Sequence, residues 1–360
     1  MFKWNFKCGW TRRLTTLLAP ALMVITASPV LGLAVSPDPR SEGTLIVAKE
    51  TQTQALCGRV EAALTAHQFR VLDASELAMR DPNVRLLGGN SQLYHYYGAL
   101  AAYSGSGLFS CGSELTFDQK RRLFEQWLVR SPKSIAAHIA LAQLWTNAGW
   151  SIRGDAYADA VTDQQWESLA TALANAKAAL GGTDGRSDPH MYYVLAEIAR
   201  GQLNPRPILD RLYADAVKAF PNYFHYYSQR VNLLQERWYG QPGELKSYAA
   251  SLLTSPGGDT GLVAYSYISF NLMRFNERLT LLQATGLSWP IVKSAYAKRG
   301  ELYGLRNRDW NALCNLALAA LDRDTAKSAL DRIHGKWDPD VWGEEKYFDE
   351  AVSWTMGAQK

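Results

Sequence analysis

The chain has 360 residues, of which 47% are hydrophobic and 20% are charged, and its formal net charge is +4. This composition excludes an intrinsically disordered protein and allows a sizeable buried core. The first 34 residues hold four basic residues and no acid, so the rest of the chain is neutral. A neutral body argues against a nucleic-acid-binding protein, because phosphate contacts need a net basic surface.

Residues 1–34 have the pattern of a signal peptide. Basic residues precede the apolar stretch 14–27, and small residues offer cleavage after Ala27 or after Ala34. The alternative is an uncleaved N-terminal anchor over residues 14–35, although two prolines within that stretch disfavour a spanning helix. Both interpretations place the body of the protein outside the cytoplasm, with membrane contact only through this segment if it is retained. Residues 35–43 form a predicted linker.

Residues 44–114 form a predicted N-terminal helical region. The spacing of apolar residues predicts a helix over 44–66 and a short helix around 74–80. An aromatic-rich helix is predicted over 90–103, followed by a loop of glycine and serine residues.

Three of the four cysteines lie after the leader. In an oxidising compartment Cys57 and Cys111 are the expected disulfide pair. That bond would close a loop of roughly 54 residues and contribute about 4 kcal/mol through chain entropy. Cys314 stands in an apolar helix and is expected to be a small buried hydrophobic residue.

Residues 115–150 have the pattern of two amphipathic helices, and this pattern recurs along the chain. Thr116 and Gln119 form a capping box at the first helix. Ser131 is expected to cap the second helix and Pro132 to be its first residue. The second helix is apolar on two faces, so it must contact neighbours on both sides, as in a stack of helical hairpins.

Similar helices follow to the end of the chain. Thr162 and Gln165 repeat the capping box, and Asp188-Pro189 begins a further helix. Other helices are predicted over 152–160, 209–220, 222–237, 242–253, 261–274, 289–305, 310–321, 325–333 and 344–354. We therefore predict an all-α fold. Its finer form is a superhelix of antiparallel helical hairpins, a degenerate tetratricopeptide-like solenoid, over residues 115–360.

Several motifs resemble a bacterial family of uncharacterised function that is built from tetratricopeptide-like helical hairpins. The motifs are SPKSIAAHIALAQLWTNAGWSIRG, the helix at Trp166, FPNYFHYYSQRVNLL followed by QERWYG, SWPIVKSAY, NALCNLALAALDRDTAKSALDRI, and Trp342 after DPD. The resemblance runs from Leu115 to Trp342. It implies the helical fold and no established activity. Together with the leader, it predicts a location in the periplasm or on the outer face of a bacterial envelope.

The sequence shows no catalytic or metal-binding constellation. No two of the six histidines stand three to five residues apart, and neither a phosphate-binding loop nor a Gly-x-Ser-x-Gly elbow occurs. We therefore predict no metal and no cofactor. Glu197, Glu236 and Glu301 are the candidate acids for cleavage of a glycan by an isolated carboxylate.

Two aromatic clusters and one helix end supply the candidate partner-binding residues. These residues are Tyr94, Tyr97, Tyr223, Tyr227, Arg237, Trp238 and Tyr239. Such side chains either bridge adjacent helices, with buried rings and satisfied polar tips, or line a concave surface that holds an extended peptide or glycan.

Three functions remain open. The first is a non-enzymatic envelope scaffold whose concave face holds a protein or peptide partner. The alternatives are an enzyme that acts on glycan or peptidoglycan with an isolated carboxylate, and a purely structural envelope component. A candidate glutamate at the bottom of a deep aromatic cleft would favour the enzyme, whereas solvated glutamates beside a broad groove would favour the scaffold.

Overall fold

The computed structural model describes residues 53–106, 111–154, 156 and 158–357. The predicted leader, the linker 35–43 and the first part of the predicted helix 44–66 lie outside these residues. Within the described residues the secondary structure is helical, and the β-structure is limited to one bridge between Arg85 and Ser91. The all-α prediction is therefore confirmed. No described helix has the length and apolar character needed to span a bilayer.

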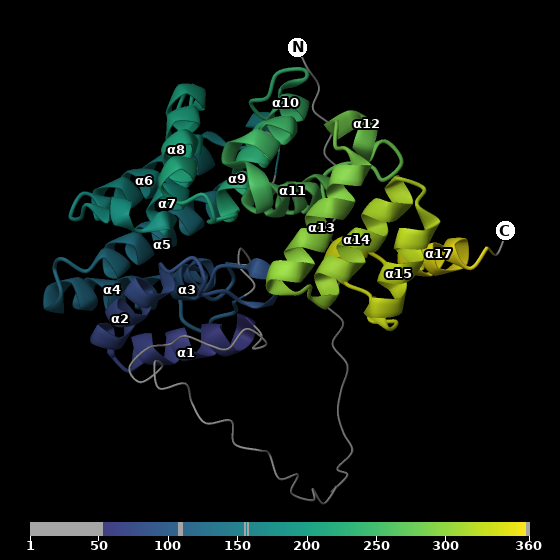
Figure 1. The fold of residues 1–360 in the computed structure, drawn as a ribbon. Helices are drawn as coiled ribbons and strands as arrows, with labels where there is room; N and C mark the ends of the chain where they lie inside the picture. Colours follow the sequence, from purple (N-terminus) through teal and green to yellow (C-terminus); the bar gives the residue numbers. More distant parts are fainter. Residues whose placement is uncertain (1–52, 107–110, 155, 157, 358–360) are drawn as a thin grey trace, which may run out of the picture.

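The helices of the first half of the fold lie together (Figure 1), and they pack around one hydrophobic core. Its elements are α1 (Thr53–Thr65), α2 (Phe69–Met79), the turn η2 (Leu87–Gly89), α3 (Gln92–Ala101), α4 (Phe117–Arg130), α5 (Ile135–Arg153), α6 (Asp163–Leu180), α7 (Pro189–Arg200) and α8 (Arg206–Ala219). Leu56 and Trp127 are both fully buried in this core. The core thus extends across the predicted boundary between residues 114 and 115.

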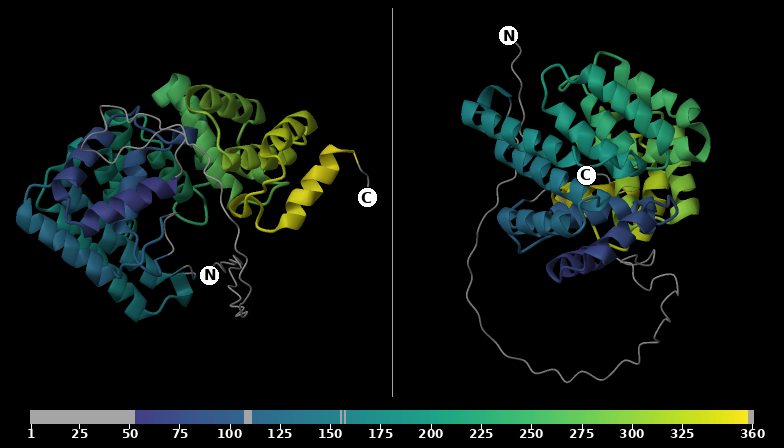
Figure 2. Two further views of the ribbon diagram at one scale, coloured as in Figure 1. Left: turned by 90° about the horizontal axis from the view of Figure 1, so that it is seen from below. Right: turned by 90° about the vertical axis from the view of Figure 1, so that its left-hand side faces the viewer.

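The second half packs around a second core. Its elements are α9 (His225–Leu233), α10 (Glu244–Ser251), α11 (Gly258–Met273), α12 (Leu281–Thr285), α13 (Trp289–Tyr303), α14 (Asn307–Ala319), α15 (Arg323–Ile333), α16 (Pro339–Trp342) and α17 (Glu345–Thr355). Helix α9 contributes side chains to both cores, because Tyr226 belongs to the first core and Tyr227 to the second. Figure 2 shows the two groups of helices side by side, α1 to α8 in one and α11 to α17 in the other.

The starts of three helices follow the predicted capping chemistry, and the start of α5 differs from its prediction. Both predicted capping boxes are present, at α4 and at α6. The prediction for Ser131-Pro132 is wrong. The hydroxyl of Ser134 accepts a hydrogen bond of 3.0 Å from the amide of Ala137 and caps α5, so Pro132 lies in the preceding turn. Helix α9 is also shorter than the predicted helix 222–237, because residues 235–239 form turns.

The predicted short helix over 152–160 is also corrected. Helix α5 continues to Arg153 and ends at Gly154, whose φ of 70° is a conformation that favours glycine. Only a 3-10 turn follows, at Ala158–Ala160.

A loop of the first half contacts the second half far along the chain. The Nε of Arg299 in α13 donates to the carbonyl oxygen of Gly88 at 2.7 Å, and the hydroxyl of Tyr267 in α11 donates to the same oxygen at 3.2 Å. Arg299 also forms a buried ion pair of 2.9 Å with Asp309. In an open row of hairpins each unit contacts only its neighbours, so this loop departs from nearest-neighbour packing. The superhelical arrangement stays a prediction.

A disulfide joins Cys57 in α1 to Cys111, with the two Cα atoms 5.6 Å apart. The bond ties α1 to the segment that leads into α4. Cys314 in α14 is a buried free thiol, and burial raises its pKa to about 12. At neutral pH this thiol is therefore protonated and packs as a small apolar group.

Candidate functional site

The two predicted aromatic clusters meet in one cluster between α3, α7 and α9. Tyr94 stacks on His225 with ring centroids 3.6 Å apart, and Tyr97 stacks on His190 at 4.4 Å. The Nδ1 of His190 lies 2.6 Å from the hydroxyl oxygen of Tyr223. The two aromatic clusters, which are far apart in the sequence, therefore pack against each other.

This aromatic cluster is almost entirely buried. Tyr97, Tyr223 and Tyr227 are each at most 5% exposed, and Tyr94 is half-buried. The hydroxyl of Tyr227 donates to the carbonyl oxygen of Pro221 at 2.7 Å. Such burial favours the structural interpretation of these tyrosines over a place on a partner-binding surface.

Three histidines of the cluster are held neutral. Burial lowers the pKa of His95 and of His190 to about 3, and it lowers the pKa of His225 well below its usual value. The Nε2 atoms of His95 and His225 have no hydrogen-bond partner among the described residues. Because the folded cluster disfavours protonation of these histidines, the stability of the fold depends on pH.

Asp188 is a buried acid beside the same cluster. It caps α7 by accepting a hydrogen bond of 2.6 Å from the amide of His190, and the hydroxyl of Tyr97 donates to it at 2.5 Å. Burial first, and then the neighbouring Glu76, raise the pKa of Asp188 well above its usual value. Asp188 is fully buried, and these hydrogen bonds join the start of α7 to α3.

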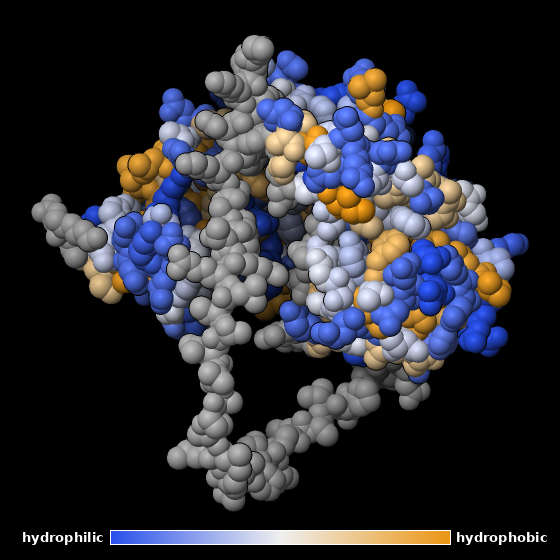
Figure 3. All heavy atoms as spheres, turned by 180° about the vertical axis from the view of Figure 1, so that it is seen from behind, coloured by the Kyte–Doolittle hydropathy of each residue, from blue (hydrophilic) through white to orange (hydrophobic). Residues whose placement is uncertain are grey.

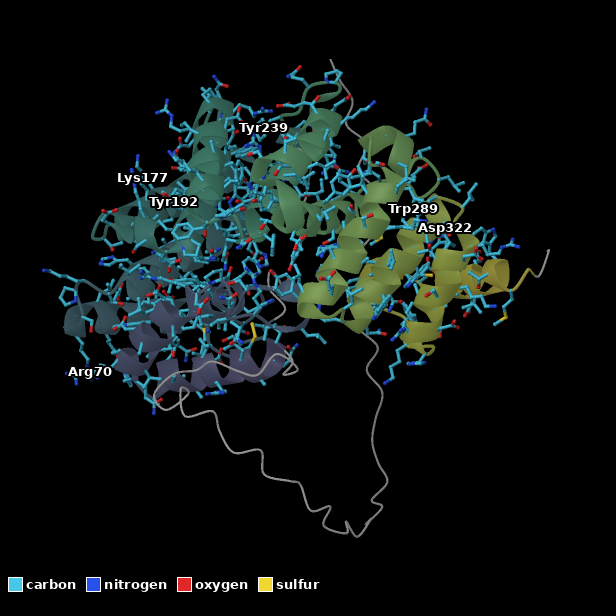
Figure 4. All side chains as sticks on the ribbon, viewed as in Figure 1. Arg70, Lys177, Tyr192, Tyr239, Trp289 and Asp322 are labelled. Carbon is cyan, nitrogen blue, oxygen red and sulfur yellow. A yellow bond between two sulfur atoms is a disulfide. The ribbon has the colours of Figure 1, made fainter. Side chains whose placement is uncertain are left out.

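The segment Arg237-Trp238-Tyr239 lies in the turns after α9, is held by side-chain contacts and has one exposed ring. Arg237 lies over the ring of Phe275 at 4.8 Å. The hydroxyl of Tyr239 donates to the carbonyl oxygen of Arg200 at 3.3 Å (Figure 4). Trp238 is 41% exposed, and it is the one exposed side chain of the three. A single exposed ring is common on protein surfaces and does not by itself define a site.

Exposed apolar side chains are scattered rather than gathered. Leu203, Val129 and Leu279 are each more than 80% exposed, and they lie on separate parts of the fold. On the face seen in Figure 3, hydrophobic and hydrophilic residues are interspersed. The candidate sites are therefore hollows of the surface rather than a flat apolar patch.

One hollow lies between α4, α5 and α6, and we call it the α4–α6 groove. It has a volume of about 600 Å³. Its lining residues are Tyr103, Phe117, Trp145, Ala148, Ile152, Gln164, Glu167, Ser168, Thr171 and Ala172. One wall is thus aromatic, and the other is the polar face of α6. This volume suits a short peptide or another small ligand.

The aromatic wall is built from the segment after α3, from α4 and from α5. Phe117, the first residue of α4, contacts Trp145 of α5 with ring centroids 4.8 Å apart and an interplanar angle of 69°. Tyr103 packs edge-on against Phe117 at 5.8 Å. All three rings are half-buried, so each keeps part of its surface open to the groove.

The close approach of α5 and α6 positions the polar wall. A Cβ atom on Gly149 would lie 2.9 Å from the Cβ of Ala172 and 3.0 Å from Leu169, so only glycine fits there. At the loop, the side-chain amide of Gln165 donates to the carbonyl oxygen of Ile152 at 3.1 Å. The capping box of α6 therefore also fixes the end of the groove.

Glu167 is the only charged residue among the described residues that line the α4–α6 groove. It is exposed, and it forms no ion pair or hydrogen bond with another described residue. Gln164 and Thr171 flank it on the same face of α6. The groove therefore combines aromatic rings with one unpaired negative charge.

A second hollow of about 540 Å³ lies between α13, α14 and α15. Lys293 and Arg332 are its charged lining residues. Lys293 is paired with Asp322 at 3.0 Å, and Asp322 also accepts from the indole of Trp289 at 2.9 Å (Figure 4). Because Lys293 is already paired with Asp322 within the fold, the α4–α6 groove is the stronger candidate.

The three candidate acids lie outside both grooves. Glu197 is half-buried, pairs with Arg200 at 2.7 Å and accepts from the side chain of Gln229 at 2.6 Å. Glu301 is exposed and pairs with Lys298 at 2.8 Å. Glu236 is exposed at the turn after α9. None of the three stands at the bottom of an aromatic cleft.

The sequence alone does not identify the residues of the α4–α6 groove as a site. The available signal was the polar face of α6, where Gln164, Glu167 and Thr171 recur at a spacing of three and four, away from the core residues Leu169 and Leu173. That spacing predicts a solvated face but does not show that an aromatic wall stands opposite.

The described residues contain no group of three or more His, Cys, Asp or Glu side chains arranged to hold a metal ion. In comparisons with known proteins, no family model, no curated protein and no solved structure matches the chain. The resemblance to a bacterial helical-hairpin family thus stays a prediction.

Proposed function

We propose that the protein is a non-enzymatic binding scaffold that holds a segment of a protein or peptide partner in the α4–α6 groove. In this proposal the chain is exported to the periplasm or to the outer face of a bacterial envelope, as its leader predicts. The helical hairpins form a curved row, and the groove is the open joint between two of its units.

The observation that supports this function is an open groove with half-buried rings on one wall and hydrogen-bonding side chains on the other. Rigid aromatic rings provide contact area with little loss of conformational entropy, and they are enriched where proteins bind one another. The hydroxyl and amide groups of Ser168, Thr171 and Gln164 can pair with the backbone of an extended segment.

The glycan-acting enzyme is the second candidate, because Glu167 is an unpaired acid beside aromatic rings. Most glycosidases, however, use two carboxyl groups that flank the scissile bond. Among the described lining residues Glu167 has no second carboxylate beside it. The enzyme hypothesis predicts that the purified protein releases sugars from peptidoglycan and that Glu167→Gln abolishes the release.

The test is a selection of binding peptides from a phage-displayed random library on the purified protein. Thr171→Trp places a bulky ring in the groove, and Ala170→Trp places the same ring at the neighbouring exposed position, which does not line it. We expect Thr171→Trp to weaken binding of the selected peptides at least tenfold and Ala170→Trp to leave it unchanged. Equal binding by both variants would refute the proposal.

A further inference from the structure

We infer that the α4–α6 groove recognises a lysine or arginine side chain of the bound segment. This inference rests on the proposed function and names the chemistry of the partner. Two independent features of the groove support it, its charge and the electrostatics of its aromatic wall.

The charge of the groove selects a cation. Glu167 is the one ionised group among the described lining residues, and no described cation neutralises it. The two cations nearest to Glu167 along the chain, Arg153 and Lys177, are not among the lining residues, and Arg153 lies over the ring of Trp166 at 5.4 Å. A basic side chain of a ligand would therefore meet an unpaired carboxylate and no competing positive charge.

The aromatic wall favours the same group. The face of an aromatic ring carries negative electrostatic potential, and cations within about 6 Å of a ring centroid are attracted to it. Tyr103, Phe117 and Trp145 come together from three separate segments, with centroid separations of 5.8 and 4.8 Å. The methylene stem of a lysine or arginine can pack on these rings while its charged end reaches the polar wall.

The polar wall supplies acceptors for the charged end. An ammonium group carries three N–H donors and a guanidinium group five, and neither accepts a hydrogen bond. Glu167, Gln164, Ser168 and Thr171 all offer acceptor oxygens from one face of α6. An acidic ligand would find no cationic partner in this wall and would be repelled by Glu167.

The experiment uses the full chain and mixtures of synthetic peptides that share random flanking residues and differ at one fixed central residue. The central residue is arginine, lysine, norleucine or glutamate, and the peptide ends are acetylated and amidated. Fluorescence anisotropy gives the Kd of each mixture. We expect the arginine and lysine mixtures to bind about tenfold more tightly than the norleucine mixture, and the glutamate mixture to bind most weakly.

Three variants assign the effect to Glu167. Glu167→Gln keeps the shape of the groove and should reduce the preference for arginine over norleucine to about threefold, because the rings remain. Glu167→Lys should reverse the preference between arginine and glutamate. Asp163→Asn removes an exposed acid one turn earlier on α6, outside the groove, and should change nothing.

The inference is overturned if the norleucine mixture binds as tightly as the arginine mixture, or if Glu167→Gln leaves the preference unchanged. Its failure can be told apart from failure of the proposed function. Binding that lacks a charge preference but is lost in Thr171→Trp would retain the peptide groove and remove only the inference. Binding that Thr171→Trp does not weaken would remove both.

Discussion

Acid should unfold this protein at a pH where most proteins of its size are stable, because the aromatic cluster holds three neutral histidines. For His95 and His190 the pKa is about 3 in the folded chain, against 6.5 for an ordinary histidine, and for His225 it is well below 6.5. As the pH falls below 6.5, the unfolded chain therefore binds protons that the folded chain refuses. Stability is lost progressively from pH 6.5 down to about pH 3.

The magnitude follows from the number of protons. Each histidine lowers the free energy of unfolding by about 1.4 kcal/mol per pH unit in this window. Asp188 acts in the opposite direction, because its raised pKa makes the folded chain hold a proton that the unfolded chain releases above pH 3.8. It therefore cancels at most one histidine. Because a histidine of the unfolded chain is only half protonated at pH 6.5, the net loss between pH 6.5 and 5.0 is about 3 kcal/mol, a large part of the stability of a typical domain.

Urea unfolding followed by circular dichroism at pH 7.5, 6.5 and 5.0 measures this loss. His225→Phe keeps the ring stack on Tyr94 and removes one titrating group, so it should recover about 2 kcal/mol at pH 5.0 relative to pH 7.5. His334→Asn is the control, since His334 is exposed and its left-handed backbone suits asparagine. An equal free energy of unfolding at pH 6.5 and 5.0, or an unchanged slope in His225→Phe, would refute the reasoning.

Three further predictions concern the fold. Replacing Cys57 and Cys111 together by alanine should cost about 4 kcal/mol in the free energy of urea unfolding, and a variant as stable as the parent would contradict this account of the bond. Asp309→Asn leaves Arg299 buried without its counter-ion and should cost about 3 to 5 kcal/mol in thermal unfolding. Glu344→Gln breaks an exposed pair with Lys346 and should leave thermal unfolding almost unchanged. Gly149→Ala should destabilise the fold by about 1 to 3 kcal/mol through overpacking against Ala172. Gly58→Ala has nothing within 4 Å of its added carbon and should stabilise α1 by up to about 1 kcal/mol. A Gly149→Ala variant that is more stable than Gly58→Ala would be inconsistent with the helix contacts.

Local chemistry in the sequence predicted most helix boundaries. The capping boxes at Thr116 and Thr162, and the Asp188-Pro189 start of α7, depend on contacts within four residues, which a sequence displays directly. The wrong prediction at Ser131-Pro132 also concerns contacts within a few residues. Two serines three residues apart can both cap a helix, and the geometry of the turn selects Ser134.

The candidate site could not be predicted in the same way, because it depends on contacts between distant segments. Apolar and aromatic spacing shows that Tyr97 and Tyr223 share a face with core residues, but it does not show whether that face is covered. In the fold His190 lies between the two tyrosines, because it stacks on Tyr97 and its Nδ1 contacts the hydroxyl of Tyr223. The contact of Arg299 with Gly88, which spans 211 residues, has no local signal at all.

The central claim is that a partner segment binds in the α4–α6 groove, and site-specific photo-crosslinking tests it most directly. A benzophenone side chain would replace Ile152, which lines the groove and is 48% exposed, or Ile208 in α8, which is 45% exposed and lies outside it. With a labelled peptide from the selection, the account predicts a covalent adduct from position 152 and none from position 208. Equal adducts from both positions, or an adduct from position 208 alone, would contradict it.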